Sequence, residues 1–191
     1  MAAAVETAGA AIGIAATISD LIPTHRECCI EIDNECATYT FVNPRIYLSS
    51  GFCATPFPPT VAPQASGIAL FTKTPNTARG SVGVFTYDLL KKDKKPAAEK
   101  IAVMFSVPYD FVSFKNWYAL GVFDKSKQCD VGLYNQMYND NQTTFRRQIP
   151  DGSCLTYEGD HITIMATMSD AYEPVIKVQV TQKRKKKLKK K

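Results

Sequence analysis

A chain of 191 residues is long enough for one domain with a full hydrophobic core, and nothing in its length requires a second. Apolar residues make up 45% of it, the mean hydropathy is -0.16, and no apolar run reaches the roughly 18 residues of a membrane-spanning helix. The net charge is +5, but residues 183–191 hold eight Lys or Arg, which leaves -3 for the remainder. The body is therefore mildly acidic and the C-terminal end strongly basic.

The first segment, residues 2–22, is rich in Ala and favours a helix that Pro23 ends. On such a helix the aliphatic side chains share one stripe, and the polar residues and a glycine share the opposite one: Glu6, Gly13, Thr17 and Asp20. At about 1.5 Å per residue the helix would match the hydrocarbon thickness of a bilayer. An amphipathic helix packed on the domain, or a frayed terminus, explains the same pattern.

The N-terminus carries Glu6 and has no Lys or Arg before Arg26, which does not fit the positively charged start of a secretory signal peptide. We therefore expect a soluble protein made without a recognisable signal peptide, which acts at a target cell membrane if released and is otherwise cytoplasmic. The six cysteines form no CxxC pair, which disfavours a zinc site. Reduced thiols are the default expectation.

From Cys28 to Val180 short β-type runs alternate with turn residues. The expected strands are 28–33, 37–42, 45–50, 67–73, 81–89, 100–107, 117–124, 162–168 and 175–180. This spacing predicts a mainly β fold, a single-domain antiparallel β-sandwich over residues 24–181, flanked by the N-terminal amphipathic helix at 1–23. One short helix is expected at 130–139, where side chains four residues apart form two adjacent stripes: Leu133 with Met137, and Tyr134 with Tyr138.

The last segment, residues 182–191, is too charged to pack and is expected to be disordered. Three interpretations of it stay open: a nuclear-localisation-like address, non-specific contact with polyanions, or attraction to anionic lipid of about 1 kcal/mol per basic residue. A nucleic-acid binder driven by this tail would show steep salt dependence. The acidic body argues against that function, so no specific nucleic-acid partner is expected.

Motifs of catalysis are missing from the sequence. It contains no nucleophile elbow, phosphate-binding loop, dinucleotide fingerprint or paired-carboxylate motif. Its two histidines, His25 and His161, stand alone and are expected to be structural or solvated. We therefore expect no enzyme, no catalytic residue, no cofactor and no metal site.

The stretch from Phe105 to Tyr118 is the densest aromatic segment, with six aromatic residues among fourteen, including the only Trp. Tyr and Trp rings partition to the headgroup level of a bilayer, and their electron-rich faces attract quaternary ammonium groups such as choline. A core strand followed by an aromatic corner would account for the same composition.

Four ordered blocks resemble one family. They are Tyr47-Leu-Ser-Ser-Gly51, Gly80-Ser-Val-Gly-Val84 with Tyr87, Phe105-Ser-Val-Pro-Tyr-Asp110 followed by Asn116-Trp117-Tyr118, and Leu133-Tyr134 with Tyr138. In this order they resemble the actinoporins, small pore-forming cytolysins first known from sea anemones, over residues 1–181. Two short segments, Cys129-Asp130 and Ala166-Thr-Met-Ser169, make the chain look closer to the actinoporin-like proteins of fishes.

The resemblance implies a site for a phosphocholine headgroup, best presented by sphingomyelin. Carried over by motif position, its residues are Ser50, Val82, Ser106, Pro108, Phe114, Tyr134 and Tyr138. The hydroxyls of the two serines could donate to phosphate oxygens, and the Tyr rings could surround the trimethylammonium group. Completion of ordinary strands by Ser50, Val82 and Ser106 is the alternative.

The resemblance also implies a set of membrane-interface aromatics, namely Tyr109, Phe111, Trp117 and Tyr118, and a pore lined by Glu6, Thr17 and Asp20. The chain departs from the family pattern at several aromatic positions. Phe114 stands where the family usually has Tyr, Ser113 replaces a Trp, and Asn139 replaces the tyrosine that normally follows Tyr138. These changes reduce ring area and hydrogen bonding.

The expected function is therefore that of a membrane-binding, pore-forming cytolysin. A soluble monomer would bind sphingomyelin or phosphatidylcholine headgroups, release residues 1–23 and form a homo-oligomer around a cation-conducting pore. The rival is a non-lytic, lectin-like β-sandwich that binds glycans or lipid headgroups, since a cleft of Ser, Tyr and Trp can also stack a sugar ring.

Overall fold

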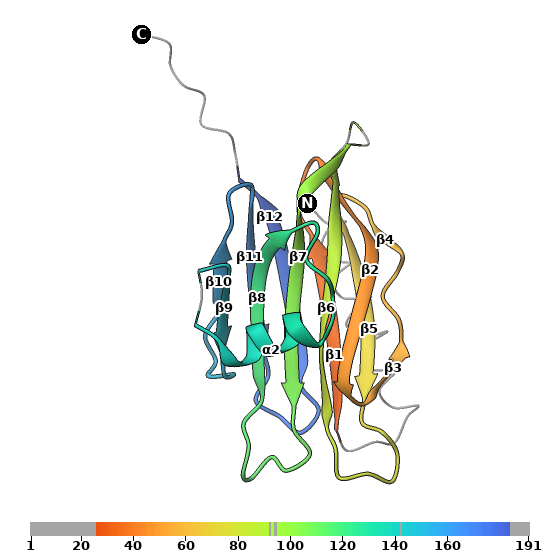
Figure 1. Cartoon of the computed structure of the whole chain (residues 1–191), viewed down its shortest axis with the longest axis vertical. Coiled ribbons are helices and arrows are strands. Elements are labelled where there is room, and N and C mark those ends of the chain that lie inside the picture. The colour runs from red at the N-terminus through yellow and green to blue at the C-terminus, as the bar shows by residue number, and fades with distance from the viewer. Residues whose placement is uncertain (1–25, 92, 94, 142, 184–191) are drawn as a thin grey trace, which may run out of the picture.

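The computed structural model describes residues 26–91, 93, 95–141 and 143–183, which form two six-stranded sheets packed face to face (Figure 1). This confirms the mainly β sandwich predicted from the strand spacing. The expectations for residues 1–23, including the pore-lining Glu6, Thr17 and Asp20, lie outside the described residues, as does the tail beyond Lys183.

The first sheet has the strand order β10-β11-β12-β1-β5-β3. Its strands are β1 (Glu27–Asn34), β3 (Phe52–Thr55), β5 (Ala65–Thr72), β10 (Leu155–Glu158), β11 (Ile162–Met168) and β12 (Val175–Gln182). All of its pairs are antiparallel except β1 with β12, which run parallel. The first and last strands of the sandwich therefore lie side by side and begin at the same end.

The second sheet has the order β4-β2-β6-β7-β8-β9. Its strands are β2 (Tyr39–Ser50), β4 (Thr60–Val61), β6 (Ser81–Lys91), β7 (Pro96–Val107), β8 (Trp117–Asp124) and β9 (Phe145–Gln148). The two runs predicted at 37–42 and 45–50 are one strand, β2, with a bulge between Val42 and Arg45. Asn43 adopts the left-handed backbone conformation there, with φ of 53°.

The strands that the sequence did not predict are β3, β4, β9 and β10. Each has four residues or fewer, too few to show an alternating pattern. All four lie at or beside a sheet edge, where tertiary pairing rather than local propensity creates the strand.

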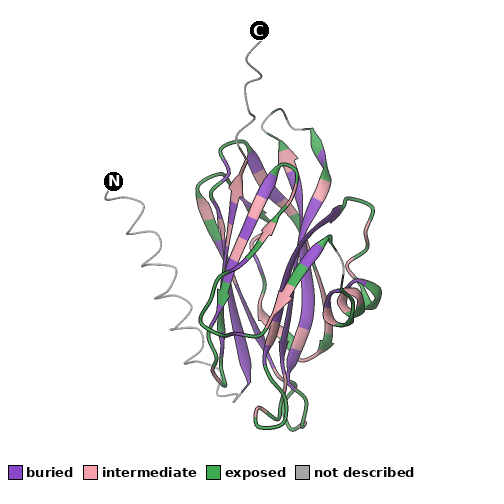
Figure 2. Cartoon of the chain, turned by 90° about the vertical axis from the view of Figure 1, so that its left-hand side faces the viewer, coloured by how far each residue is buried: buried purple, intermediate pink, exposed green. Residues whose placement is uncertain are grey.

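The main core lies between the sheets and is rich in aromatic rings. Phe57 packs against Phe71, Phe85 and Tyr87, and Phe71 packs against Phe105 with ring centroids 4.7 Å apart. Alternate residues of the central strands point the other way, and helix α2 (Val131–Asn139) covers them, as the edge-on view in Figure 2 shows. Strand β7 is consequently buried on both faces over most of its length.

Helix α2 confirms the helix predicted at 130–139. Asp130 caps it, because its carboxylate accepts a hydrogen bond from the Leu133 amide at 2.9 Å. Leu133 and Met137 are fully buried against Met104 and its neighbours on the outer face of the second sheet. Among the described residues, no helix has the length and apolar character needed to cross a bilayer.

The loops 73–80, 108–116 and 169–174 gather at one end of the sandwich, which we call the loop end. In Figure 1 it is the lower end, opposite the β6–β7 hairpin and the end of β12. The glycine that closes the first of these loops, Gly80, lies so close to the Val107 carbonyl that a Cβ would sit 1.8 Å from it. The loops 73–80 and 108–116 are therefore held against each other by backbone contact.

Candidate functional site

Four of the predicted site residues form one row across the second sheet. Ser50 of β2 pairs with Val82 of β6, Val82 pairs with Ser106 of β7, and Ser106 pairs with Trp117 of β8. Residues directly opposite on neighbouring strands point to the same face. The row ends close to the loop end, on the face that α2 covers.

The tyrosines of α2 lie next to this row. The rings of Tyr134 and Tyr138 are stacked, with centroids 5.6 Å apart, and Tyr47 of β2 lies 6.3 Å from Tyr134. Burial raises the pKa of Tyr134 to about 12, and a hydrogen bond with the Ser106 side chain opposes that rise. We call Tyr47, Tyr134, Tyr138, Ser106 and Trp117 the aromatic shelf.

Tyr47 and Arg147 were not among the predicted site residues. Tyr47 belongs to the same motif as Ser50, and its pairing with Val84 places it on the shelf side of β2. Arg147 of β9 holds its guanidinium 5.1 Å from the centre of the Trp117 ring. No sequence pattern predicts that contact, because β9, with four residues, is too short to be recognised.

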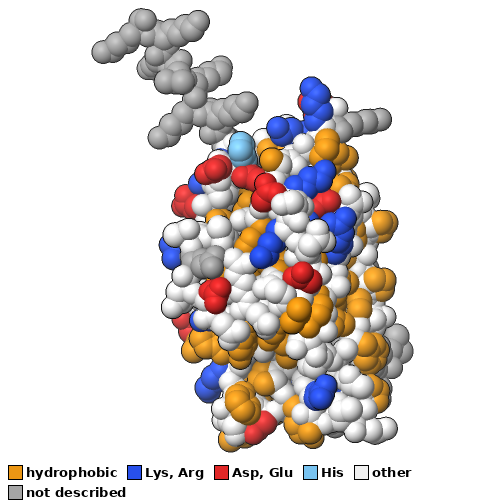
Figure 3. Space-filling view, viewed as in Figure 1, with side chains coloured by type: hydrophobic (Ala, Val, Ile, Leu, Met, Phe, Trp, Pro, Cys, Tyr) orange, Lys and Arg blue, Asp and Glu red, His pale blue; other side chains and the backbone are white. Residues whose placement is uncertain are grey.

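The loop 108–116 presents apolar side chains to solvent. The Asp110 carboxylate accepts hydrogen bonds from the amides of Val112 and Ser113, both at 3.0 Å, and the Ser113 bonds hold the pKa of this carboxyl below its usual value. The turn leaves Val112, Phe114 and Tyr109 exposed by 87%, 62% and 48%. Figure 3 shows hydrophobic groups at this lower end and charges gathered mainly above it.

Arg26 ties three segments of the loop end together. Its guanidinium donates to the Pro108 carbonyl at 2.6 Å, to the Tyr172 carbonyl at 2.9 Å and to the Asn116 side chain at 3.4 Å. The group also lies over the rings of Phe111 and Tyr172, at 5.1 and 5.4 Å. Burial lowers the pKa of Arg26. Arg26 therefore holds the backbone that carries the exposed residues of the loop 108–116 in place.

A hollow of about 420 Å³ opens beside this anchor. Lys73 and Tyr109 form one side of it, with the ammonium 5.5 Å from the ring centre, and Tyr172 contributes a ring that is 57% exposed. Sequence reasoning missed Lys73 and Tyr172 because the loops that carry them are distant in the chain from the aromatic stretch.

The structure corrects two expectations. Tyr118 is not an interfacial residue: it is fully buried in the inter-sheet core, with its hydroxyl 3.5 Å from the Ala166 carbonyl. The alternation of β8 points it inward while Trp117 points outward. The Ser50 hydroxyl is not a free donor, because it donates to the Gly80 carbonyl at 2.8 Å. Phe111 is half-buried against Tyr172.

The other predicted site residues differ in their exposure to solvent, and Ser106 is buried, with 5% of its surface exposed. Val82, Pro108 and Trp117 are half-buried, and Phe114 is exposed. The six cysteines, all within the described residues, are unpaired, and the described residues contain no cluster of His, Cys, Asp and Glu with metal-binding geometry.

Comparison with known families identifies the family of the chain. A family model described as sea anemone cytotoxic protein matches residues 1–182, almost the whole chain. The chain belongs to this family. Its members, the actinoporins, are toxins rather than enzymes, and the match confirms the resemblance read from the four sequence blocks.

Two relatives show how the similarity is distributed. DELTA-alicitoxin-Pse1b of Phyllodiscus semoni is 34% identical over 120 residues, which are 61% of this chain and 49% of the toxin. The chain thus matches about half the length of that relative. DELTA-stichotoxin-Hcr4b of Radianthus crispa is 24% identical over 181 residues, covering 92% of this chain and 96% of the toxin.

A solved structure supports the fold. The crystal structure of the lipid binding protein Nakanori superimposes with a TM-score of 0.67 at 12% identity, covering 92% of this chain and 80% of that one. At this identity the similarity establishes a shared β-sandwich and nothing about the ligand.

Proposed function

We propose that this actinoporin is a membrane-binding cytolysin that recognises phosphocholine headgroups on its aromatic shelf and forms cation-conducting pores. A monomer in solution docks on a membrane that contains sphingomyelin or phosphatidylcholine. Residues 1–23 then leave the domain, insert, and line the pore of a homo-oligomer with Glu6, Thr17 and Asp20 facing water. Charged side chains within a bilayer are tolerated when they face a water-filled cavity, which is why this polar stripe suits a pore.

The observation that carries the proposal is the stacked pair Tyr134 and Tyr138 beside the Ser106 hydroxyl. Stacked phenol rings offer an electron-rich wall to a trimethylammonium group, for which cation–π contact is worth about 0.5–2 kcal/mol. The Ser106 hydroxyl, which is only 5% exposed and is hydrogen-bonded to Tyr134, orients a phenol that can donate to the phosphate that follows choline by two carbons. One ligand can therefore use both parts of the shelf.

The loop end supplies the docking surface. Tyr109, Val112 and Phe114 are exposed on the loop that follows the Ser106 strand, so their insertion at the headgroup level would bring the shelf to the membrane surface. Trp117 adds an interfacial ring at the edge of the shelf. Its neighbour Arg147 supplies a guanidinium whose N–H groups can donate hydrogen bonds to phosphate oxygens.

The test is dye release from phosphatidylcholine vesicles with and without sphingomyelin. We would compare the full chain with a chain that starts at Thr24, and Tyr138→Leu with Tyr157→Leu. Tyr138 and Tyr157 are both half-buried tyrosines, but Tyr157 lies on β10 away from the shelf. We expect sphingomyelin-dependent leakage that the truncation abolishes, and binding about tenfold weaker for Tyr138→Leu alone.

Leakage undiminished in the truncated chain would show that residues 1–23 do not insert. Binding without leakage by either chain would exclude a pore and favour the non-lytic, lectin-like alternative. Equal losses for the two tyrosine variants would mean that the shelf has no special part in headgroup recognition.

A further inference from the structure

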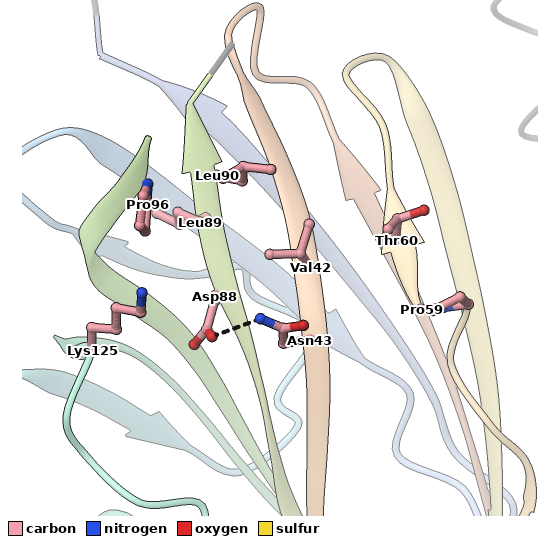
Figure 4. Close-up of a pocket in the computed structure, with 9 residues that line it drawn as sticks. All are labelled: Val42, Asn43, Pro59, Thr60, Asp88, Leu89, Leu90, Pro96 and Lys125. Carbon is pink, nitrogen blue, oxygen red and sulfur yellow. Dashed lines mark hydrogen bonds between the residues drawn. The ribbon is translucent and has the colours of Figure 1, made fainter. Parts of the chain in front are cut away.

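A second recess lies far from the shelf, on the outer face of the second sheet towards the end opposite the loops (Figure 4). Its volume is about 500 Å³, within the range that accommodates small ligands. The bulge of β2, the upper half of β6 and the loop after β8 surround it, and its polar side chains are Asn43, Thr60, Asp88 and Lys125. None of these residues belongs to the shelf or the loop end.

Asp88 is the central group of the recess. Its side chain is only 6% exposed, and it forms an ion pair of 3.4 Å with Lys100, whose side chain is fully buried. Its Oδ1 atom is buried and faces the Lys100 ammonium at 3.4 Å without a hydrogen bond, and Oδ2 accepts one long bond of 3.3 Å from the Asn43 amide. A carboxylate oxygen offers about two lone-pair positions, so Oδ2 retains unused capacity as an acceptor. An incompletely paired oxygen at a recess favours a ligand that donates hydrogen bonds.

The surroundings define the kind of donor. Lys100 compensates the charge of Asp88, so the floor of the recess is close to neutral and does not select a cation. Among the described residues no aromatic ring lines the recess, which removes the wall that a quaternary ammonium group needs. Lys125 is the one cationic side chain that lines the recess in the described part of the chain, and one cation is too little to hold a free phosphate.

What remains is a neutral ligand with several hydroxyl groups. Asn43 and Thr60 each combine a donor and an acceptor, and the other side chains of the recess are aliphatic: Val42, Pro59, Leu90 and Pro96. Leu89 also borders the recess, but its side chain belongs to the inter-sheet core. A pyranose ring has this composition, with vicinal hydroxyls at its edge and C–H groups on its faces. We propose that the recess is a saccharide-binding site in which Asp88 and Asn43 hold adjacent hydroxyls of one sugar.

This site would stay open when the loop end is on a membrane, because the recess lies towards the opposite end of the sandwich. It would then meet glycans that project above the bilayer. The inference does not depend on headgroup recognition or on pore formation, so it can hold or fail by itself.

The experiment is an NMR titration of the full, amide-labelled chain with methyl glycosides of galactose, glucose and mannose, with N-acetylglucosamine, and with glucuronate and galactose 6-sulfate. Asn43→Gly keeps the left-handed backbone and removes the amide, and Asn76→Gly is its matched control, since Asn76 also has positive φ but lies at the loop end. Lys125→Gln is paired with Lys127→Gln, which lies on the same loop outside the recess.

We expect at least one neutral sugar to shift the amides of Val42, Leu90 and Lys125, with affinity about tenfold lower in Asn43→Gly and unchanged in Asn76→Gly. Stronger binding of the acidic sugars, lost in Lys125→Gln, would still support a saccharide site and identify an acidic ligand. Absence of shifts with the whole panel, or shifts that map to Tyr134 and Tyr138, would overturn the proposal.

Discussion

Replacement of Arg26 by Met tests whether the loop end is one fixed unit. The variant loses three hydrogen bonds of the guanidinium of Arg26, a residue that is only 2% exposed, and it loses the contacts with two rings. Hydrogen bonds to charged groups contribute about 1.5–3 kcal/mol each, but the carbonyls of Pro108 and Tyr172 are near the surface and can bind water instead. The Met side chain keeps part of the packing of the Arg26 aliphatic stem, which further reduces the loss of stability. We estimate a decrease of about 3 kcal/mol in the free energy of unfolding.

Denaturant unfolding of the full chain measures this change, and hydrogen exchange locates it. We expect faster exchange in the loops 108–116 and 169–174, with little change in β6 and β7. Arg79→Met is the control, because Arg79 is exposed in the loop 73–80 at the same end of the molecule. A loss below about 1 kcal/mol in Arg26→Met, with unchanged loop exchange, would refute the idea that Arg26 fixes these loops.

Three further outcomes follow from the structure. Tyr118→Ala should reduce the free energy of unfolding by about 3–5 kcal/mol, because it removes a fully buried ring. Tyr118→Phe should reduce it by about 1 kcal/mol or less and leave vesicle binding intact. Weakened vesicle binding by Tyr118→Phe would contradict the burial of Tyr118. The pKa of Asp110 lies below its ordinary 3.8, so the ionised carboxylate stabilises its turn above that pH, and this stabilisation is lost as the pH falls through the lower folded-state pKa. NMR of the loop amides at stepwise lower pH would follow the change. Loss of the turn at a pH above 3.8 would refute this prediction. Cys154, the exposed thiol, should be alkylated first, and Cys29 and Cys36, with pKa values raised by burial to about 11 and 12, should react only after unfolding, as mass spectrometry of timed samples would show.

The sequence predicted the sandwich well because its long central strands carry their own signal. Runs such as 100–107 and 162–168 alternate or remain apolar over seven or more residues, and the structure has strands there. The helix at 130–139 was predicted equally well from its side-chain pairs at i, i+4 spacing and from Asp130 at its start. The parallel pairing of β1 with β12 could not be predicted from the sequence, since contacts between residues more than 140 positions apart set this strand order.

The candidate site was predicted in part, for a similar reason. Motif positions identified Ser106 and Tyr134, which the fold brings into contact, but they could not separate Trp117 from Tyr118. Neighbouring residues of a strand face opposite sides, and only the register of β8 against β7 decides which side is outer.

The sequence alone therefore determined the family, the β-sandwich and the residue types that suit a choline headgroup, because these depend on local pattern and on ordered motifs. Tertiary structure decided which of those residues are available. It buried Tyr118, engaged the hydroxyl of Ser50, placed Arg147 over Trp117, and assembled the Asp88 recess from strands that no local pattern connects. Burial and pairing are properties of the packed chain, and they are absent until distant segments meet.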